Sequence, residues 1–213
     1  MAITHAFTLI RAEKFDLASA GENQVTERLE DMLENCIRNR GVIEGFDSNF
    51  FGKVARGSET VNYCGKKISK KPDLIFNLRR EHRTDWDQRQ DAIFVECKPV
   101  DKKHRLGDHY CAVGKTTSGI ERFVIGDYAW AMEQAMMIAY VRDGFQILSH
   151  LAESLVAPNT RAALGEPSIL TCVVEANNEH CQGLYCTSHQ RLFPWADGRP
   201  ATPIDLYHTW HEC

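Results

Sequence analysis

The chain has 213 residues, 43% of them hydrophobic and 25% charged, which is an ordinary composition for a folded globular protein. Disordered, collagen-like and coiled-coil chains are excluded, and the length suits a single domain over residues 1–213. Lysine and arginine number 25 against 29 acidic residues, so a net charge of −4 excludes a general attraction to polyanions. Residues 66–105 differ, with 12 basic and 7 acidic side chains, and we expect a polyanion to contact this region first.

Targeting signals are not evident in the sequence. Charged side chains, beginning with Arg11 and Glu13, interrupt the N-terminal region where a signal peptide would be apolar. The longest apolar stretch, residues 129–141, is too short to span a bilayer. We therefore expect a cytoplasmic protein with no membrane partner. The 8 cysteines include no CxxC pair, so we expect reduced, mostly buried thiols.

The first predicted element is a helix over Ala20–Arg40, in which apolar residues recur at helical spacing. Ser19 is a candidate N-terminal cap, and Gly41 ends the pattern. The glycine-punctuated segments Val42–Ala55 and Glu59–Tyr63 predict one or two short strands.

Two aromatic and β-branched runs, Pro72–Leu78 and Asp91–Val100, predict neighbouring antiparallel strands joined by the polar segment Arg79–Gln90. The largely apolar segment Asp127–Arg142 and the amphipathic segment Phe145–Val156 predict two helices.

Two further strands are predicted over Ile169–Ala176 and Gly183–His189. The resulting order α, β, β, β, α, α, β, β predicts the α/β class, with a mixed central sheet flanked by helices.

The chemically informative residues lie at the ends of the two neighbouring strands. Alternation places Glu96 and Lys98 on one face of their strand, while Cys97 points into the apolar layer with Val95. Antiparallel pairing would bring Asp73 beside Glu96, and two adjacent carboxylates repel each other unless a cation lies between them. Oxygen ligands of this kind suit Mg²⁺.

The leading helix supplies another acidic residue. At about 100° per residue, Glu22 falls in the middle of the apolar stripe formed by Val25, Leu29 and Leu33. A carboxylate that faces the core needs a partner, such as a metal-bound water or a cation.

These residues resemble the PD-(D/E)xK nuclease superfamily, the restriction-endonuclease-like fold. The match consists of Glu22, Pro72-Asp73 and, after 22 intervening residues, Glu96-x-Lys98. The resemblance implies an αβββαβ core over about residues 20–142. It implies that Asp73 and Glu96 ligate Mg²⁺ together with the Cys97 carbonyl, that Mn²⁺ can substitute, that Glu22 acts through a water, and that Lys98 positions the attacking water.

The implied activity is metal-dependent hydrolysis of phosphodiester bonds, leaving a 5′-phosphate and a 3′-hydroxyl. DNA is favoured over RNA as the nucleic-acid partner by resemblance alone, as is a restriction-type or phage-defence role. Specificity would come from a homodimer, from an activating partner protein, or be absent. The alternative is a catalytically inactive nuclease-fold module that binds nucleic acid or a partner protein.

Six further residues are candidates for contacting nucleic acid. Each has an alternative role as a solvated surface or helix residue. Gln134 resembles a glutamine that some superfamily members carry on a second core helix. In those members a tyrosine follows that glutamine by four residues, whereas this position is Ile138 here. The six candidates are Lys70, Lys71, Arg122, Gln134, His189 and Arg191.

A second cluster could be interpreted as zinc ligands: His180, Cys181, Cys186 and His189. Their spacing departs from paired zinc knuckles, so we favour buried or incidental thiols. No Walker A loop, GxGxxG turn, GxSxG elbow or HExxH helix occurs, which argues against an ATPase, a dehydrogenase, a serine hydrolase and a zincin.

Overall fold

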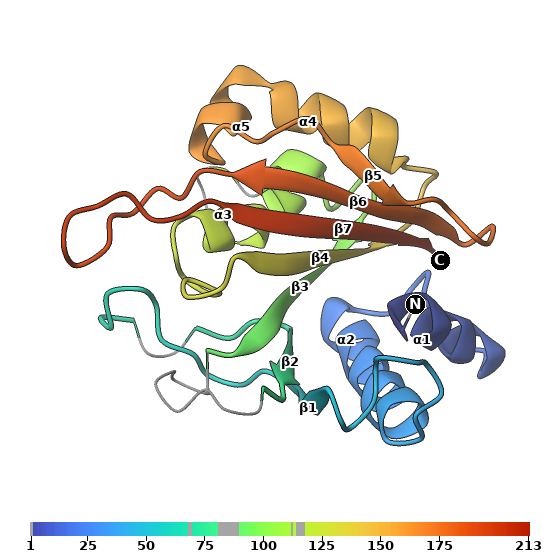
Figure 1. The fold of residues 1–213 in the computed structure, drawn as a ribbon. Helices are drawn as coiled ribbons and strands as arrows, with labels where there is room; N and C mark the ends of the chain where they lie inside the picture. Colours follow the sequence, from blue (N-terminus) through green and yellow to red (C-terminus); the bar gives the residue numbers. More distant parts are fainter. Residues whose placement is uncertain (1, 68–69, 81–89, 112, 114–117) are drawn as a thin grey trace.

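The computed structural model describes residues 2–67, 70–80, 90–111, 113 and 118–213 (Figure 1). The chain is of the α/β class, and its 7 strands form one mixed sheet in the order β1-β2-β3-β4-β7-β6-β5. The strands are β1 Phe51–Arg56, β2 Leu74–Leu78, β3 Ala92–Val100, β4 Gln134–Val141, β5 Thr171–Val174, β6 Cys181–His189 and β7 Ile204–Glu212. The helices are α1 Ala2–Ala12, α2 Glu22–Asp31, η1 Met32–Arg38, η2 Leu106–Tyr110, α3 Gly119–Val124, η3 Ile147–Leu151, α4 Ala152–Val156 and α5 Pro158–Ala163.

The sheet is antiparallel toward both edges and parallel at its centre. Strands β1, β2 and β3 form an antiparallel meander, and Leu74 of β2 pairs with Val95 of β3. Strand β4 runs parallel to both β3 and β7, and β6 and β5 continue antiparallel to the far edge. From α2 to β4 the elements follow the order αβββαβ when the short η segments are left aside.

Helices cover both faces of the sheet (Figure 1). On one face α1, α2 and η1 pack their apolar side chains, including Phe7 and Leu29, against Val95 and Cys97 of β3. On the other face η2, α3, η3 and α4 pack over a second cluster that includes Phe94 of β3. The alternation expected along β3 is confirmed, because consecutive residues of this strand belong to opposite clusters.

The predicted antiparallel pair is confirmed as β2 and β3, and the predicted leading helix as α2 continued by the π-helical η1. The cap differs: Gly21, not Ser19, precedes the first helical residue. Much of the polar connection predicted between the strands, residues 81–89, lies outside the described residues.

The helix predicted over Asp127–Arg142 is wrong, because residues 134–141 form strand β4. This strand lies between two parallel neighbours and is buried on both faces from Met137 to Val141. A strand covered on both faces is apolar without alternation, so its sequence resembles that of a buried helix. Gln134 is therefore the first residue of a strand and not part of a second core helix.

All 8 cysteines lie in the described part of the chain and are free thiols, as predicted, although only Cys97, Cys111 and Cys181 are buried. Among the described residues, no helix combines the length and apolar character needed to cross a bilayer.

Candidate active site

The centre of the candidate site is an ion pair on strand β3. Glu96 and Lys98 share one side of the strand, and Glu96 Oε1 lies 3.0 Å from Lys98 Nζ. Only 1% of Glu96 and 6% of Lys98 is exposed to solvent. Charged side chains are rarely buried to this extent without partners, so the rest of the site must balance them.

Asp73 reaches this pair from the residue before β2. The register that pairs Leu74 with Val95 continues to place Asp73 opposite Glu96. Its Oδ2 atom accepts a hydrogen bond of 2.7 Å from the Cys97 backbone N–H and lies 3.4 Å from Lys98 Nζ. Asp73 is therefore anchored to β3 by the backbone as well as by charge.

Glu22 completes the cluster from a different layer of the molecule. It is the first residue of α2, and its Oε1 atom lies 2.7 Å from Lys98 Nζ. The helical projection predicted that Glu22 needs a partner, and the Lys98 ammonium is that partner. The structure brings together all four residues predicted for catalysis, with three carboxylates around one ammonium.

Three contacts that sequence reasoning missed hold Glu96 from the other side. The Tyr128 hydroxyl donates to Glu96 Oε2 at 3.0 Å, and the Gly119 N–H donates to Oε1 at 3.4 Å. Arg122 Nη1 lies 3.8 Å from Oε1 and also donates to the Tyr128 hydroxyl. Spacing along the chain carries no signal for these contacts, because they form across loops and the α3 segment.

Gly119 is required at its position for a steric reason. Its φ of +54° is in the left-handed region, and a Cβ atom would lie 1.9 Å from the Tyr110 carbonyl oxygen. Only glycine therefore allows the start of α3 to approach η2 and present its N–H to Glu96.

Burial and electrostatic interactions within the cluster shift the pKa values of its side chains. Burial, together with repulsion from Glu22, raises the pKa of Asp73 despite the attraction of Lys98. Burial, together with repulsion from Asp73, likewise raises the pKa of Glu96. Burial disfavours the Lys98 ammonium, but the combined attraction of the three carboxylates outweighs it and raises the lysine pKa. With all four groups ionised, they carry two excess negative charges.

A divalent cation matches this excess charge, and the carboxylate oxygens are the donor atoms that Mg²⁺ and Mn²⁺ prefer. Within the described residues, no three His, Cys, Asp or Glu side chains are already grouped to hold a metal. At this cluster the carboxylates converge on Lys98 Nζ instead. The donor set therefore fits a dication, provided that the ammonium moves out of its present position.

The predicted nucleic-acid contacts do not gather as one surface. Lys70 pairs with the buried Asp127 at 2.6 Å, and Lys71 pairs with Glu59 at 3.2 Å. Gln134 is exposed, and its Nε2 atom lies 3.5 Å from the Tyr207 hydroxyl. Of the six candidates, Arg122 alone contacts the carboxylate cluster.

His189 and Arg191 are buried and have structural partners. Arg191 donates to the backbone carbonyls of Ala129 and Met132. His189 Nδ1 lies 2.8 Å from the Leu164 carbonyl, and Nε2 lies 2.8 Å from the Thr187 hydroxyl. Both ring nitrogens of His189 are therefore engaged within the protein, and Arg191 uses its Nη2 atom on the backbone.

The same histidine belongs to a buried chain of hydrogen bonds, and this chain assigns its tautomers. The Leu164 carbonyl can only accept, so His189 Nδ1 carries the proton and Nε2 accepts from Thr187. Thr187 then accepts from His208 Nε2 at 2.7 Å, and His208 Nδ1 accepts from Tyr110 at 3.0 Å. Burial holds both histidines neutral, lowering the pKa of His189 to about 4 and of His208 to about 3.

The residues considered as zinc ligands are not arranged as a metal site. Cys181 and His189 stand at opposite ends of β6, His180 is exposed beside Glu179, and His189 is committed to the buried chain. Alternation along β6 places Cys186 and His189 on opposite faces. The preference for incidental thiols over a zinc centre is consistent with this placement.

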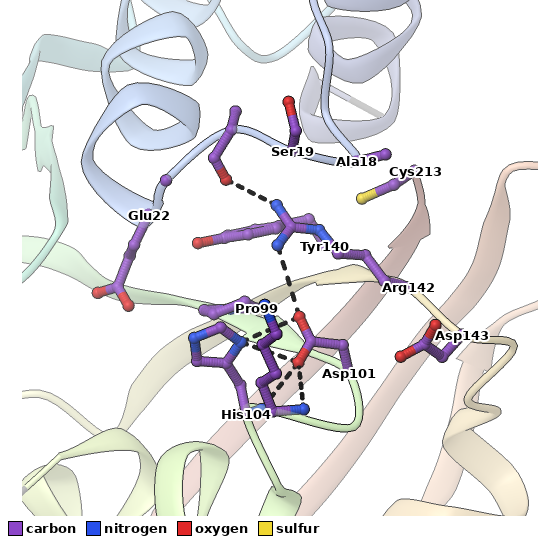
Figure 2. A pocket seen from close by; sticks show the side chains of 13 residues that line it. Ala18, Ser19, Glu22, Pro99, Asp101, His104, Tyr140, Arg142, Asp143 and Cys213 are labelled. Atoms are coloured by element: carbon purple, nitrogen blue, oxygen red, sulfur yellow. Dashed lines mark hydrogen bonds and ion pairs between the residues drawn. The ribbon is translucent and has the colours of Figure 1, made fainter.

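A cavity of about 610 Å³ opens beside the carboxylate cluster (Figure 2). Its walls are the segment before α2, the ends of β3 and β4, and the C-terminal Cys213. Glu22 lines both the cavity and the cluster, and Pro99, which directly follows Lys98, forms part of the wall. Glu22 is thus the residue that the cavity and the cluster share.

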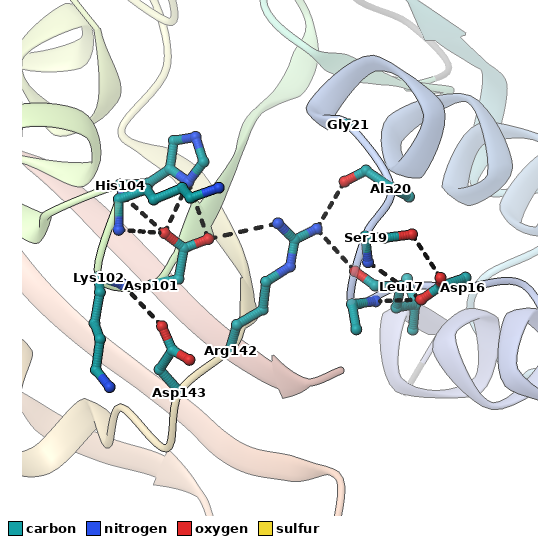
Figure 3. Close-up of polar contacts among 12 residues, drawn as sticks. Asp16, Leu17, Ser19, Ala20, Gly21, Asp101, Lys102, His104, Arg142 and Asp143 are labelled. Carbon is teal, nitrogen blue, oxygen red and sulfur yellow. Dashed lines mark hydrogen bonds and ion pairs between the residues drawn. The ribbon is translucent and has the colours of Figure 1, made fainter.

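Arg142 fixes one wall of this cavity (Figure 3). Its Nη2 atom donates to the carbonyls of Leu17 at 2.8 Å and Ala20 at 2.7 Å, and its Nη1 atom lies 3.5 Å from Asp101 Oδ2. This guanidinium ties the end of β4 to the segment that leads into Glu22, so it positions the acid of α2.

Comparison of the chain with protein-family models, with curated proteins and with solved structures gives no match. The likeness to the PD-(D/E)xK superfamily therefore consists of the residues named above and of the element order.

Proposed function

We propose that the protein is a Mg²⁺-dependent nuclease that hydrolyses phosphodiester bonds, with Asp73, Glu96, Lys98 and Glu22 as its active site. The observation that carries the proposal is the convergence of three carboxylates, from α2, β3 and the residue before β2, on one buried lysine. The αβββαβ order of elements around them supports the same proposal.

Asp73 and Glu96, with the Cys97 carbonyl, would hold the metal, and Glu22 would support it through a water. A bound Mg²⁺ supplies Lewis-acid polarisation of the phosphate and lowers the pKa of a nearby water. Tyr128 and Gly119 fix the carboxylate of Glu96, so this ligand is preorganised.

Lys98 has two roles in this proposal. Without metal, its ammonium balances the negative charge of the three carboxylates and holds them close together. When it leaves that position, the ammonium is free to orient the attacking water and to stabilise the negative charge that develops on the phosphate. Its raised pKa keeps it charged across the physiological pH range.

DNA as substrate, a role in defence, and a cytoplasmic location follow from the family resemblance and the sequence. Arg122 is the one predicted contact residue that lies against the cluster, so we assign it to the phosphate-facing side of the site.

The test is a cleavage assay on supercoiled, linear and single-stranded DNA and on RNA, with Mg²⁺, Mn²⁺ or EDTA. We expect metal-dependent cleavage by the wild type and by Lys53→Ala, a matched control because Lys53 is exposed on β1. We expect at least about a hundredfold loss in Lys98→Ala, since positioned charge contributes this much in comparable sites. Cleavage by Lys98→Ala at the wild-type rate would contradict the proposal. Absence of both cleavage and metal binding would instead favour the inactive nuclease-fold module.

A further inference from the structure

Tyr140 of β4 has a buried hydroxyl that the proposed cleavage chemistry does not use. The residue is fully buried, and its hydroxyl has no hydrogen-bond partner among the described residues. Buried polar groups are normally hydrogen-bonded, because an unsatisfied donor destabilises the folded state. This hydroxyl therefore suits a state of the molecule in which an acceptor comes within its reach.

The Tyr140 hydroxyl faces Glu22, and packing fixes this relationship. Figure 2 shows the hydroxyl directed to the side on which Glu22 lies, and both residues line the cavity. The Arg142 guanidinium lies 5.4 Å from the centre of the Tyr140 ring. The same guanidinium donates to the carbonyls of Leu17 and Ala20, in the segment that leads into α2. Burial and then repulsion from Glu22 raise the pKa of Tyr140, so the hydroxyl keeps its proton and remains a donor.

Of the three carboxylates in the cluster, that of Glu22 is the most able to move. Its side chain is 37% exposed, against 21% for Asp73 and 1% for Glu96. The β3 backbone anchors Asp73, and the Tyr128 hydroxyl anchors Glu96. Within the described part of the chain, the Glu22 carboxylate has a single partner, the Lys98 ammonium, and the cavity leaves space beside it.

We propose that Tyr140 is a positioning residue for Glu22: its hydroxyl donates a hydrogen bond to the Glu22 carboxylate when the Lys98 ammonium leaves the cluster. The inference rests on the proposed function, which requires that departure. Glu22 then has a partner in both states, the ammonium in one and the hydroxyl in the other. One carboxylate oxygen is held by Tyr140, and the second stays available to the cluster.

A hydroxyl suits this role better than a second cation. It donates to a carboxylate without adding a positive charge, whereas another lysine beside Glu22 would repel a dication. A hydrogen bond to a charged acceptor is also stronger than one between neutral groups. Tyr140 can therefore hold Glu22 firmly and still leave its negative charge for the metal.

The first test needs neither metal nor cleavage. Urea unfolding in EDTA is measured for the wild type, Tyr140→Phe, Lys98→Met and the double variant, because removing the ammonium releases Glu22 permanently. We expect Tyr140→Phe to change the unfolding equilibrium constant of the wild type less than about twofold. In the Lys98→Met background it should raise that constant about tenfold, since only there does the hydroxyl hold a carboxylate.

The matched control is Tyr207→Phe, which should have the same small effect in both backgrounds. The Tyr207 hydroxyl lies 3.5 Å from Gln134 Nε2, at the opposite end of β4 from Tyr140.

The second test keeps Lys98 and uses Mn²⁺ as the probe. Calorimetry gives the Mn²⁺ affinity of the wild type, Tyr140→Phe, Glu22→Ala and their double variant. We expect Tyr140→Phe to weaken Mn²⁺ binding about tenfold, as groups that orient a metal site do. In the Glu22→Ala background it should have no further effect, because the hydroxyl acts through that carboxylate.

Equal effects of Tyr140→Phe in both backgrounds of the urea series would overturn the inference, even if metal-dependent cleavage is intact. Dependence on Lys98 in a protein that never cleaves would keep Tyr140 as the second partner of Glu22 and reject the nuclease. Where Lys98→Met does not fold, the calorimetric series decides. An unchanged Mn²⁺ affinity of Tyr140→Phe, or no Mn²⁺ binding by the wild type, then overturns the inference.

Discussion

At the scale of single residues, the proposed metal site depends on the position of one ammonium. Lys98 Nζ lies within 3.4 Å of an oxygen of each of the three carboxylates, and this is the place that a dication would compete for. Neutralising the lysine without changing its shape should therefore open the site to metal while it removes a group needed for catalysis.

The corresponding prediction concerns Lys98→Met. We expect Mg²⁺ or Mn²⁺ to bind at least about tenfold more tightly than to the wild type, a gain of about 1.4 kcal/mol. Without metal, the variant should lose stability by about 3 kcal/mol, because removing one partner leaves buried charges unpaired. Calorimetric titration and urea unfolding, each with and without metal, measure these changes. Weaker metal binding in the variant would show that the ammonium does not compete with the cation.

A second residue-scale prediction concerns Tyr128→Phe. The variant removes the hydroxyl that donates to Glu96 and keeps the buried ring. Because hydrogen bonds to a carboxylate stabilise its charged form, their loss raises the pKa of Glu96 further. We expect the acidic limb of the pH–rate profile to move to higher pH and the rate at neutral pH to fall about tenfold. The control is Tyr63→Phe, whose ring stacks on Phe193 away from the cluster. A profile identical to that of the control would remove Tyr128 from the site.

At the scale of secondary-structure elements, α3 is held in place by its first residue. We expect Gly119→Ala to destabilise the protein by more than about 2 kcal/mol, because the added Cβ meets the Tyr110 carbonyl and the backbone is left-handed. Gly107→Ala is the control, since among the described residues no atom outside its chain neighbours lies within 4 Å of its added Cβ. Urea unfolding of both variants checks the difference. Similar midpoints would mean that η2 and α3 separate at little cost.

Some helices and strands of the structure could be predicted from the sequence. Aromatic and β-branched runs and helical spacing identified β2, β3 and α2. These elements carry Glu22, Glu96 and Lys98, and Asp73 directly precedes β2. Their meeting followed from local rules, because strand alternation and one antiparallel register determine most of the cluster.

The failures have physical causes as well. Strand β4 was predicted as a helix because burial on both faces removes alternation. Strand β7 was not predicted, because polar residues such as His208 and His211 interrupt the apolar pattern expected of a buried strand. The contacts of Tyr128 and Gly119 with Glu96 depend on tertiary packing, for which a single sequence carries no pattern.

At the scale of the whole molecule, buried histidines determine how stability responds to acid. Burial lowers the pKa of His189 to about 4 and of His208 and His211 to about 3, while each would be near 6.5 in the unfolded chain. The unfolded state therefore binds more protons at these sites, so stability is lost as pH falls below about 6.5. Asp73 and Glu96 act in the opposite sense, because their pKa values are raised in the folded state.

Because the histidine pKa values lie near 6.5 in the unfolded chain and at about 4 and about 3 in the folded chain, we expect a loss of stability between pH 7 and pH 5. Each net proton contributes a slope of about 1.4 kcal/mol per pH unit. Urea midpoints measured at several pH values test the sign, and Asp73→Asn should steepen the decline because it removes one opposing group. A midpoint that rises toward pH 5 would contradict the assignment of neutral, buried histidines.

The central claim is that Glu22, Asp73, Glu96 and Lys98 form one metal-dependent catalytic site, and one paired measurement tests it most directly. Purified wild type and Asp73→Asn are titrated with Mn²⁺ by calorimetry, and the same samples are assayed for cleavage of a single-stranded and a supercoiled DNA. We expect metal binding and cleavage by the wild type and loss of both in the variant. Equal metal binding and equal cleavage by the two proteins would contradict the claim.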